Sequence, residues 1–366
     1  MSKSEADVYE QKRSAKIKDM SRSKDDTGVY YITTNSKTDG YGNSKDFLED
    51  ALKSEGVNIS KTFKNQKVAF IYHSPRSISR SDCEKNILYS MFESDKIPDS
   101  WIEDLKKFDE IVVPSKFCYK AFKKAGFESK VVPLGVCAKT YKYKKRKTAI
   151  EENRDFVFLH YNAFNVRKGF IELFQAFNDA FKNTDAVKLI LKTTLNNLPL
   201  PIAPQIYPNI EIVRGKIDND EMLKLLHRAD CFVYPSRGEG FGLPPLEAGS
   251  TGITSIVPDA HGIAEYFDAS AFYEVKVEKA CKALYTRYKK EDTGKMIVCD
   301  VDDLAQKMRE AYENQKKIKL MGEKARDVAN KYSWERCAKN LKRIITAVEK
   351  KEVTGKTKKL NIRKVI

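Results

Sequence analysis

Residues 234–250 constrain the fold of this 366-residue chain more than any other stretch. An apolar run over residues 229–234 predicts a short buried strand. Gly238, Gly240 and Gly242 then alternate with a carboxylate and an aromatic residue, and a proline pair opens a helix. Glycines leave main-chain N–H groups open to a ligand, and a helix N-terminus adds unpaired N–H groups and partial positive charge. The stretch therefore predicts a phosphate site.

Two acidic residues accompany that site. Glu239 stands in the predicted loop, and Glu247 stands eight positions further on, in the first turns of the helix. Two carboxylates facing a phosphate would repel it, whereas each could accept hydrogen bonds from hydroxyl groups on one side of it. A nucleotide sugar offers this order of groups: sugar hydroxyls, a diphosphate and ribose hydroxyls. The alternative is a glycine-rich turn with two solvated acids.

The motif Pro-Ser-x-x-Glu-Gly-Phe-Gly-Leu-Pro-x-Leu-Glu-Ala, with Glu239 and Glu247 as its E-x7-E pair, resembles that of retaining glycosyltransferases of the large family 4 type. The resemblance implies an α/β fold with two Rossmann-like domains facing across a cleft (GT-B) and a C-terminal helix that crosses back to the N-domain. It implies that Glu239 contacts the donor sugar and Glu247 the ribose. Within the same motif, the donor-binding residues would also include Gly240, Phe241, Gly242 and Leu243.

Length and composition fit two soluble domains, since 41% of the residues are hydrophobic. No apolar run approaches the ~20 residues of a membrane span, and the charged N-terminus lacks a signal peptide's apolar segment. We therefore expect a cytoplasmic protein, with peripheral membrane contact as an option. The seven cysteines lack a C-x-x-C pair, and the four histidines lack zinc-ligand spacing. We expect free thiols, no metal and no cofactor apart from the substrate.

The net charge of +16 is concentrated in two segments. Residues 139–148 hold six basic residues and no acid, and residues 350–366 hold seven basic residues and one acid. An anionic partner, either a membrane surface or DNA, is suggested at these two segments. A solvated linker and a frayed tail are the alternative.

Composition and periodicity divide the chain into six parts. They are a charged, disordered extension (1–27), an N-terminal Rossmann-like acceptor domain (28–138), a basic linker (139–154), a C-terminal Rossmann-like nucleotide-sugar domain (155–332), the crossing helix (333–350) and a basic tail (351–366).

In the first domain, a strand over 29–34 precedes a glycine loop and a helix over 44–55. Gly40 and Gly42 lie in that loop, which resembles the family's N-domain loop near the diphosphate and the acceptor; a tight turn is the alternative. His73 follows the next strand, where such folds place their sites, and could contact the donor sugar or the acceptor. Further along, we expect a helix capped by Ser100, a helix capped by Ser115 and ended by Gly126, and a strand over 128–134.

In the second domain, Arg167 and Lys168 sit where a loop enters a helix, so a guanidinium and an ammonium could grip two phosphate oxygens. They match the basic pair that neutralises the leaving diphosphate in the resembled family. In the resembled fold the nucleotide base rests near the end of the strand expected over 210–214, so Arg214, Gly215, Lys216 and Ile217 are candidates for the base pocket. Asp218 precedes a helix with Glu221 in its first turn, which indicates an N-cap rather than a metal site.

The resemblance implies that a UDP-, GDP- or ADP-linked sugar passes to a hydroxyl of a glycan, lipid-linked or protein-glycan acceptor, with retention and without a metal. Arg167, Lys168 and loop amides would stabilise the departing diphosphate, with Glu239 and His73 completing the catalytic set. Three rivals stay open: a glycosyltransferase acting on modified bases in DNA, a hydrolase using the two glutamates, and a non-catalytic nucleotide-sugar binding module.

Overall fold

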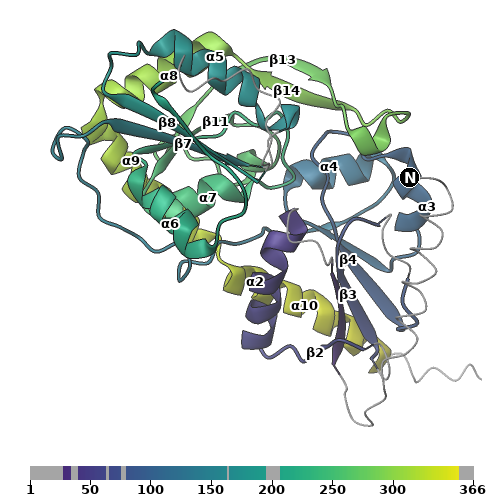
Figure 1. The fold of residues 1–366 in the computed structure, drawn as a ribbon. Helices are drawn as coiled ribbons and strands as arrows, with labels where there is room; N and C mark the ends of the chain where they lie inside the picture. The colour runs from purple at the N-terminus through teal and green to yellow at the C-terminus, as the bar shows by residue number, and fades with distance from the viewer. Residues whose placement is uncertain are drawn as a thin grey trace, which may run out of the picture.

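The computed structural model describes residues 28–33, 40–62, 66–75, 80–162, 165–194 and 207–353. The predicted extension over 1–27 and most of the basic tail lie outside these residues. Figure 1 shows two α/β domains side by side, each built on one twisted sheet. The fold class predicted from sequence is thereby confirmed.

The first sheet has six strands in the order β2-β1-β3-β4-β5-β6, all parallel. The strands are β1 (Val29–Thr33), β2 (Ile59–Ser60), β3 (Val68–Tyr72), β4 (Lys85–Tyr89), β5 (Glu110–Val113) and β6 (Lys130–Val131). Strand β6 covers two of the seven residues expected over 128–134. Strand β4 was not predicted from sequence, because its five residues begin with lysine and asparagine.

Helix α2 (Gly40–Ser54) begins four residues before the predicted start. Gly40 and Gly42 therefore lie in its first turn, which corrects the expected glycine loop. Ser100 does not cap the next helical segment. That segment starts as a 3-10 turn, η2 (Asp99–Trp101), after Pro98 and continues as α3 (Ile102–Leu105). The backbone N–H of Ser100 instead donates to the Glu291 carboxylate (2.9 Å).

The predicted cap of α4 (Lys116–Lys124) is confirmed. The Ser115 hydroxyl accepts from the backbone N–H of Cys118 (3.2 Å) and so satisfies one of the helix's unpaired donors. The helix ends before Gly126, whose φ of +91° lies in the left-handed region that glycine adopts without strain.

The second sheet has the order β12-β11-β10-β7-β8-β9 and is also parallel throughout. Its strands are β7 (Phe156–Asn162), β8 (Val187–Thr193), β9 (Ile210–Val213), β10 (Cys231–Val233), β11 (Thr254–Val257) and β12 (Phe272–Glu274). Strands β7 and β8 read as nearly continuous apolar runs because helices cover both faces of a parallel sheet.

The helices of this domain are η3 (Val166–Lys168), α5 (Phe170–Ala180), α6 (Asn219–Arg228), α7 (Leu243–Ser250), η4 (His261–Glu265), α8 (Val301–Glu313) and α9 (Gln315–Lys331). Asp218 caps α6 in a capping box with Glu221, as predicted. The Asp218 side chain accepts from the Glu221 N–H (2.8 Å), so this carboxylate serves the helix end.

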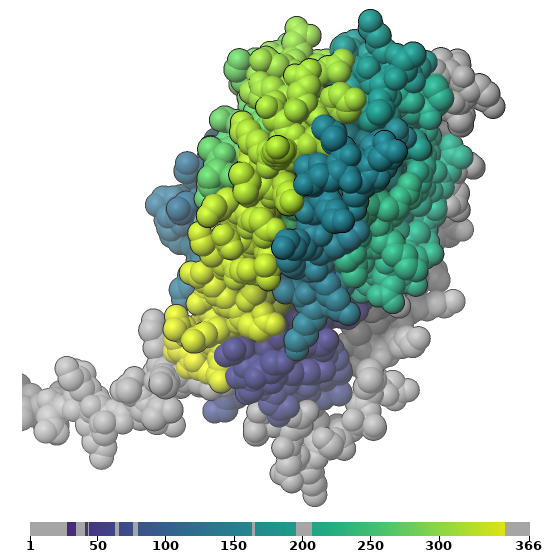
Figure 2. All heavy atoms as spheres, turned by 90° about the vertical axis from the view of Figure 1, so that its left-hand side faces the viewer, coloured from purple at the N-terminus to yellow at the C-terminus, as the bar shows by residue number. Residues whose placement is uncertain are grey.

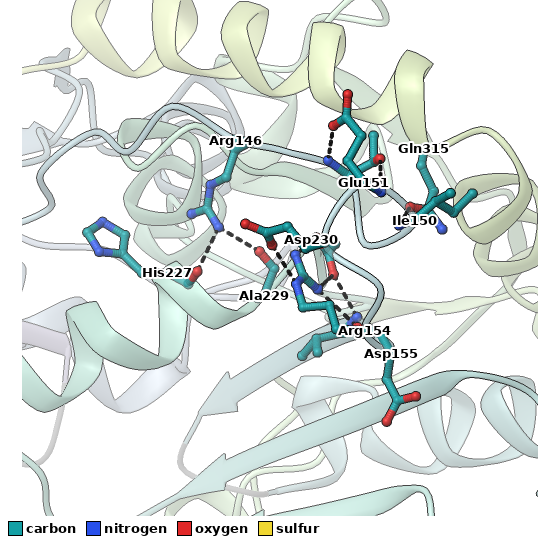
Figure 3. Close-up of polar contacts among 12 residues, drawn as sticks. Arg146, Ile150, Glu151, Arg154, Asp155, His227, Ala229, Asp230 and Gln315 are labelled. Atoms are coloured by element: carbon teal, nitrogen blue, oxygen red, sulfur yellow. Dashed lines mark hydrogen bonds and ion pairs between the residues drawn. The ribbon is translucent and has the colours of Figure 1, made fainter.

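The basic segment 139–148 runs along the C-terminal helices rather than as a free linker (Figure 2). Tyr143 donates to Glu323 of α9 (2.5 Å), and the guanidinium of Arg326 lies over the Tyr143 ring (4.0 Å). Arg146 donates to the backbone carbonyls of residues 226, 227 and 229 at the end of α6, where the helix dipole favours a cation (Figure 3). Part of the predicted anion-binding charge is thus used inside the protein.

Arg154, at the end of the linker, forms a two-pronged ion pair with Asp230 (2.6 and 2.7 Å) (Figure 3). Asp230 also accepts from the Val157 N–H (2.8 Å) at the start of β7. The pair therefore fixes the point at which the chain enters the second sheet.

The last helix, α10 (Trp334–Val353), leaves the second domain and lies against α2 of the first (Figure 1). Trp334 stacks on Phe47 with ring centroids 6.4 Å apart, and Lys342 caps α2 by donating to the Glu55 carbonyl. The buried residues of α10 and α2 share one hydrophobic cluster with the second domain, so the helix ties the domains together.

A second tie is an antiparallel hairpin, which we call the arm, formed by β13 (Val277–Lys282), η5 (Thr286–Tyr288) and β14 (Lys295–Cys299). It extends from the second domain across the first (Figure 1). Tyr288 packs in the core of the first domain, where its hydroxyl accepts from the Trp101 indole N–H (3.0 Å). At the tip, Ser94 donates to the Thr293 carbonyl (2.6 Å).

Replacing Tyr288 with Phe should lower the free energy of unfolding by about 1–3 kcal/mol, because it leaves the buried Trp101 N–H without this acceptor. Denaturant unfolding followed by tryptophan fluorescence measures the change. Leu284→Ala, on the same arm but 78% exposed, is the control and should change it by no more than about 0.5 kcal/mol. Equal losses in both variants would contradict this role of the arm.

Candidate functional site

Two loops of the second domain meet at the carboxyl end of its sheet. Gly169, with φ +70°, ends η3, and a Cβ there would come within 1.9 Å of the Pro235 carbonyl oxygen. The N–H of Arg237 donates to the Arg167 carbonyl (2.7 Å), and the Arg237 side chain pairs with the buried Glu172 (2.6 Å). The loop before α5 and the loop over residues 234–242, which we call the signature loop, are therefore fixed against each other.

Arg167, Lys168 and Glu239, predicted from sequence to act together, are in direct contact. Lys168 donates to Glu239 Oε1 (2.5 Å), and an Arg167 guanidinium nitrogen lies 3.3 Å from the same oxygen. The hydroxyls of Ser236 (2.6 Å) and Tyr234 (2.9 Å) also donate to it. Among the described residues, all four contacts are to Oε1, so Oε2 is the oxygen left to accept from a bound hydroxyl.

The electrostatics of this cluster follow from its burial. Burial alone would raise the pKa of Glu239, but Lys168 and Arg167 outweigh it and hold that pKa well below the usual range. Glu239 is thus ionised at any physiological pH. Burial and the adjacent Arg167 lower the pKa of Lys168 to about 8, even though Glu239 favours its charged form.

Glu247 has a different environment. Tyr161 donates to its carboxylate (2.5 Å), Tyr141 is a second hydroxyl neighbour, and no cation contacts it among the described residues. Burial raises the pKa of Glu247, and the two tyrosines offset this only in part. The two acids of the motif therefore lie in different environments: Glu239 contacts two cations, and Glu247 contacts two tyrosine hydroxyls.

The signature glycines meet the first domain. A Cβ on Gly238 would lie 2.1 Å from the Glu93 carbonyl oxygen, and one on Gly240 would lie 2.8 Å from the Met91 Cβ. Ser115 donates to the Gly240 carbonyl (2.7 Å) across the same junction. In this arrangement the bare backbone at Gly238 and Gly240 makes room for the neighbouring domain. The predicted contact of these glycines with a ligand stays a prediction.

The rest of the motif forms the start of α7. Gly242, with φ +88°, is its N-cap residue and accepts from the Tyr266 hydroxyl. The Phe241 side chain is buried in the core against the Tyr266 ring, with centroids 5.5 Å apart, so only its backbone is left to face a donor. Leu243 is half-buried at the first position of the helix.

His73 lies at the carboxyl end of β3, in the first domain. Its ring stacks on Tyr41 of α2 (5.8 Å), and its Nδ1 is 3.0 Å from the Ser74 carbonyl. Gly40 and Gly42 flank Tyr41, whose hydroxyl accepts from the Met91 N–H (2.9 Å). Tyr41, which the sequence analysis passed over, thus supports the loop after β4.

The predicted base-pocket residues lie at the end of β9. Arg214 and Lys216 are exposed, and Gly215, with φ +82°, turns the chain between them. A residue missed from sequence holds this turn: the buried Lys192 of β8 donates to the Gly215 carbonyl (2.6 Å). A lysine inside a strand gave no signal of this contact.

Two more neighbours of the cluster were missed. His261 adopts φ +44° at the start of η4, and its Nε2 lies 2.9 Å from the Ser236 carbonyl. Burial lowers its pKa to about 4, so it is neutral at pH 7. Glu93, in the loop after β4 of the first domain, lies 3.7 Å from the Arg167 guanidinium.

Within the described part of the chain, no cluster of three or more His, Cys, Asp or Glu side chains could hold a metal ion. In the same part, no helix is long and apolar enough to cross a bilayer.

Comparisons of the sequence and of the fold with known proteins both find glycosyltransferases. Residues 206–341 match the model of family 4 glycosyltransferases in conflict systems. Anabaena HepE in complex with UDP and glucose superposes with a TM-score of 0.62 at 12% identity, over 87% of this chain and 99% of that one. The chain has the GT-B fold, and residues 206–341 are similar to family 4 glycosyltransferases.

Further similar proteins are matched over smaller parts of their own length. Sucrose-phosphate synthase from Thermosynechococcus elongatus has a TM-score of 0.58 at 15% identity, over 84% of this chain and 78% of that one. A putative glycosyltransferase of a Sulfolobus islandicus filamentous virus is 29% identical over 44% of this chain. A Mycobacterium tuberculosis glycogen synthase is 45% identical over 14% of this chain. The matched stretches span 43% and 12% of these two curated relatives.

Neutralising the two motif glutamates should have different effects on the free energy of unfolding. Glu239→Gln leaves Arg167 and Lys168 without their shared carboxylate, so we expect a loss of about 3–5 kcal/mol in unfolding free energy at pH 7. Glu247→Gln removes a buried charge with no cation beside it, so we expect a change within about 1 kcal/mol, or a gain. Urea unfolding measures both.

The pH dependence has opposite signs as well. Since the folded-state pKa of Glu239 is depressed, the advantage of wild type over Glu239→Gln is full above about pH 4.5 and shrinks as pH falls below it. Since the folded-state pKa of Glu247 is raised, wild type loses ground to Glu247→Gln as pH rises from 4.5 through that raised pKa. Matching pH profiles for the two variants would contradict the assigned environments.

Proposed function

We propose that this protein is a retaining glycosyltransferase that moves a sugar from a nucleotide-diphosphate sugar to a hydroxyl acceptor. The observation that carries the proposal is the convergence of Arg167 and Lys168 on Glu239 at the signature loop of a GT-B fold. Two fixed cations beside a buried carboxylate suit a diphosphate that departs next to a sugar.

The proposed roles follow from the charges. Arg167 and Lys168 bind the diphosphate and stabilise the charge that develops on it, so that the reaction needs no metal ion. Glu239, held ionised by the same cations, presents Oε2 to a sugar hydroxyl. Glu247, between Tyr141 and Tyr161, accepts from the ribose hydroxyls.

UDP is the first nucleotide to test, because HepE has been solved with UDP and with UDP-glucose. GDP and ADP are the alternatives, with Arg214, Gly215 and Lys216 at the base. The acceptor we propose is a glycan or a lipid-linked glycan. Staphylococcus aureus TarM, a further structural relative at 15% identity, has been solved with α-GlcNAc-glycerol, fondaparinux and UDP.

Thermal shift tests the donor. We expect one of UDP, GDP and ADP to raise the melting temperature, and its sugar conjugates to be turned over to free nucleotide. Ligand at 100 times its dissociation constant stabilises by about 2.7 kcal/mol, which such a scan detects. Binding without turnover on any acceptor would favour a non-catalytic module, and no shift with any of the three nucleotides would end the proposal.

Arg167→Ala should lower turnover by about 100-fold or more, because it removes a cation from the departing diphosphate. Arg228→Ala is the matched control: Arg228, the last residue of α6, is exposed and pairs with Glu211 of β9, so its loss should leave turnover unchanged. Steady-state rates of nucleotide release, with circular dichroism to confirm folding, decide between them. Similar rates in the two variants would rule out this role for Arg167.

A further inference from the structure

Glu93 is a carboxylate of the first domain held inside the cationic site of the second. It lies in the loop after β4, at the carboxyl end of a parallel sheet, where such folds place ligand contacts. Its carboxylate is 3.7 Å from the Arg167 guanidinium, and its backbone carbonyl lies against Gly238 of the signature loop. Neither glycosyl-donor contact proposed above uses it.

The loop that carries Glu93 is fixed by helix α2 and by the arm. Tyr41 of α2 accepts from the Met91 N–H (2.9 Å) on one side of Glu93. On the other side, the arm binds Ser94 and Asp95: Ser94 donates to the Thr293 carbonyl (2.6 Å), and the Asp95 N–H donates to the Lys295 carbonyl (3.2 Å). The position of Glu93 beside Arg167 is therefore built by both domains.

Glu93 and Glu239 compete unequally for the cations. Glu239 takes four contacts at 2.5–3.3 Å and its side chain is 9% exposed, whereas the Glu93 side chain is 29% exposed. Among the described residues, Arg167 is the charged group that contacts Glu93, at a distance too long for a strong hydrogen bond. The Glu93 contact is the weaker one.

The charges of the site indicate which carboxylate separates from Arg167 when a donor binds. Arg167 and Lys168 face Glu93 and Glu239, so these four groups sum to zero before any ligand arrives. A diphosphate adds negative charge, which competes with both carboxylates for Arg167. The longer Glu93 contact gives way at lower cost, which leaves an ionised carboxylate facing the bound donor from the first domain.

We propose that Glu93 is an acceptor-binding residue: donor phosphate replaces it on Arg167, and its freed carboxylate then accepts a hydrogen bond from the acceptor hydroxyl. An ionised carboxylate repels a phosphate but readily accepts a hydrogen bond from a hydroxyl. The hydroxyls of the donor are already assigned to Glu239 and Glu247, so the hydroxyl left for Glu93 is that of the acceptor. This inference rests on the proposed glycosyl transfer. It makes donor binding precede productive acceptor binding.

The test uses the full-length protein with Glu93→Gln and Glu93→Ala, and Asp99→Asn as control. Asp99 lies six residues further along, pairs with Lys96 and has a side chain 68% exposed. Calorimetry with UDP, GDP and ADP measures nucleotide binding. Product analysis with the sugar conjugate of the tightest nucleotide measures transfer to glycerol against hydrolysis by water.

Both Glu93 variants should bind the nucleoside diphosphate as tightly as wild type or about fivefold more tightly, because a competing carboxylate is gone. In Glu93→Ala, the ratio of glycerol transfer to hydrolysis should fall about tenfold. The Asp99→Asn control should match wild type in both measurements. Melting temperatures near wild type show that the fold is intact.

Nucleotide binding that weakens in the Glu93 variants would overturn the inference, since it would place Glu93 on the donor side. An unchanged transfer ratio would overturn it too. A wild-type protein that binds none of the three nucleotides would instead sink the proposed function itself, and the acceptor role with it.

Discussion

The shared ion pair at Glu239 Oε1 is the interaction on which the rest of the site depends. Two cations and two hydroxyls meet on one buried oxygen, so loss of that carboxylate would leave both buried cations without their shared counter-charge. The cluster fixes the loop before α5 against the signature loop. A diphosphate entering beside it finds positive charge already oriented, which is the preorganisation that stabilises a leaving group.

The two domains are joined more firmly than a single linker would allow. Helix α10 packs on α2, the arm inserts Tyr288 beside Trp101, and Gly238 and Gly240 accept the loop over Met91–Glu93 at close range. The basic linker is also held in place, because Arg146 donates to backbone carbonyls at the C-terminus of α6. Charge that composition alone would assign to an anionic partner is thus partly structural.

Sequence patterns predicted elements with a strong local cause. Ser115 and Asp218 cap helices as expected, because a side chain that satisfies an end N–H acts within three residues. The contact of Arg167 and Lys168 with Glu239 could also be predicted from sequence, because these residues follow β7 and β10, which are neighbouring parallel strands. Strand β4, the arm and the early start of α2 were missed, because their stability comes from packing rather than from propensity.

The sequence by itself determined the architecture and the identity of the charged groups: two parallel sheets, a bare loop and an E-x7-E pair. Tertiary structure decided what those groups experience. Glu239 and Glu247 are the same residue type eight positions apart, yet cations lower the pKa of one and burial raises that of the other. Gly238 and Gly240 also lie against the first domain, and Glu93, 74 residues before Arg167, lies beside the Arg167 guanidinium. Burial and long-range proximity set these outcomes, and neither is written in a local pattern.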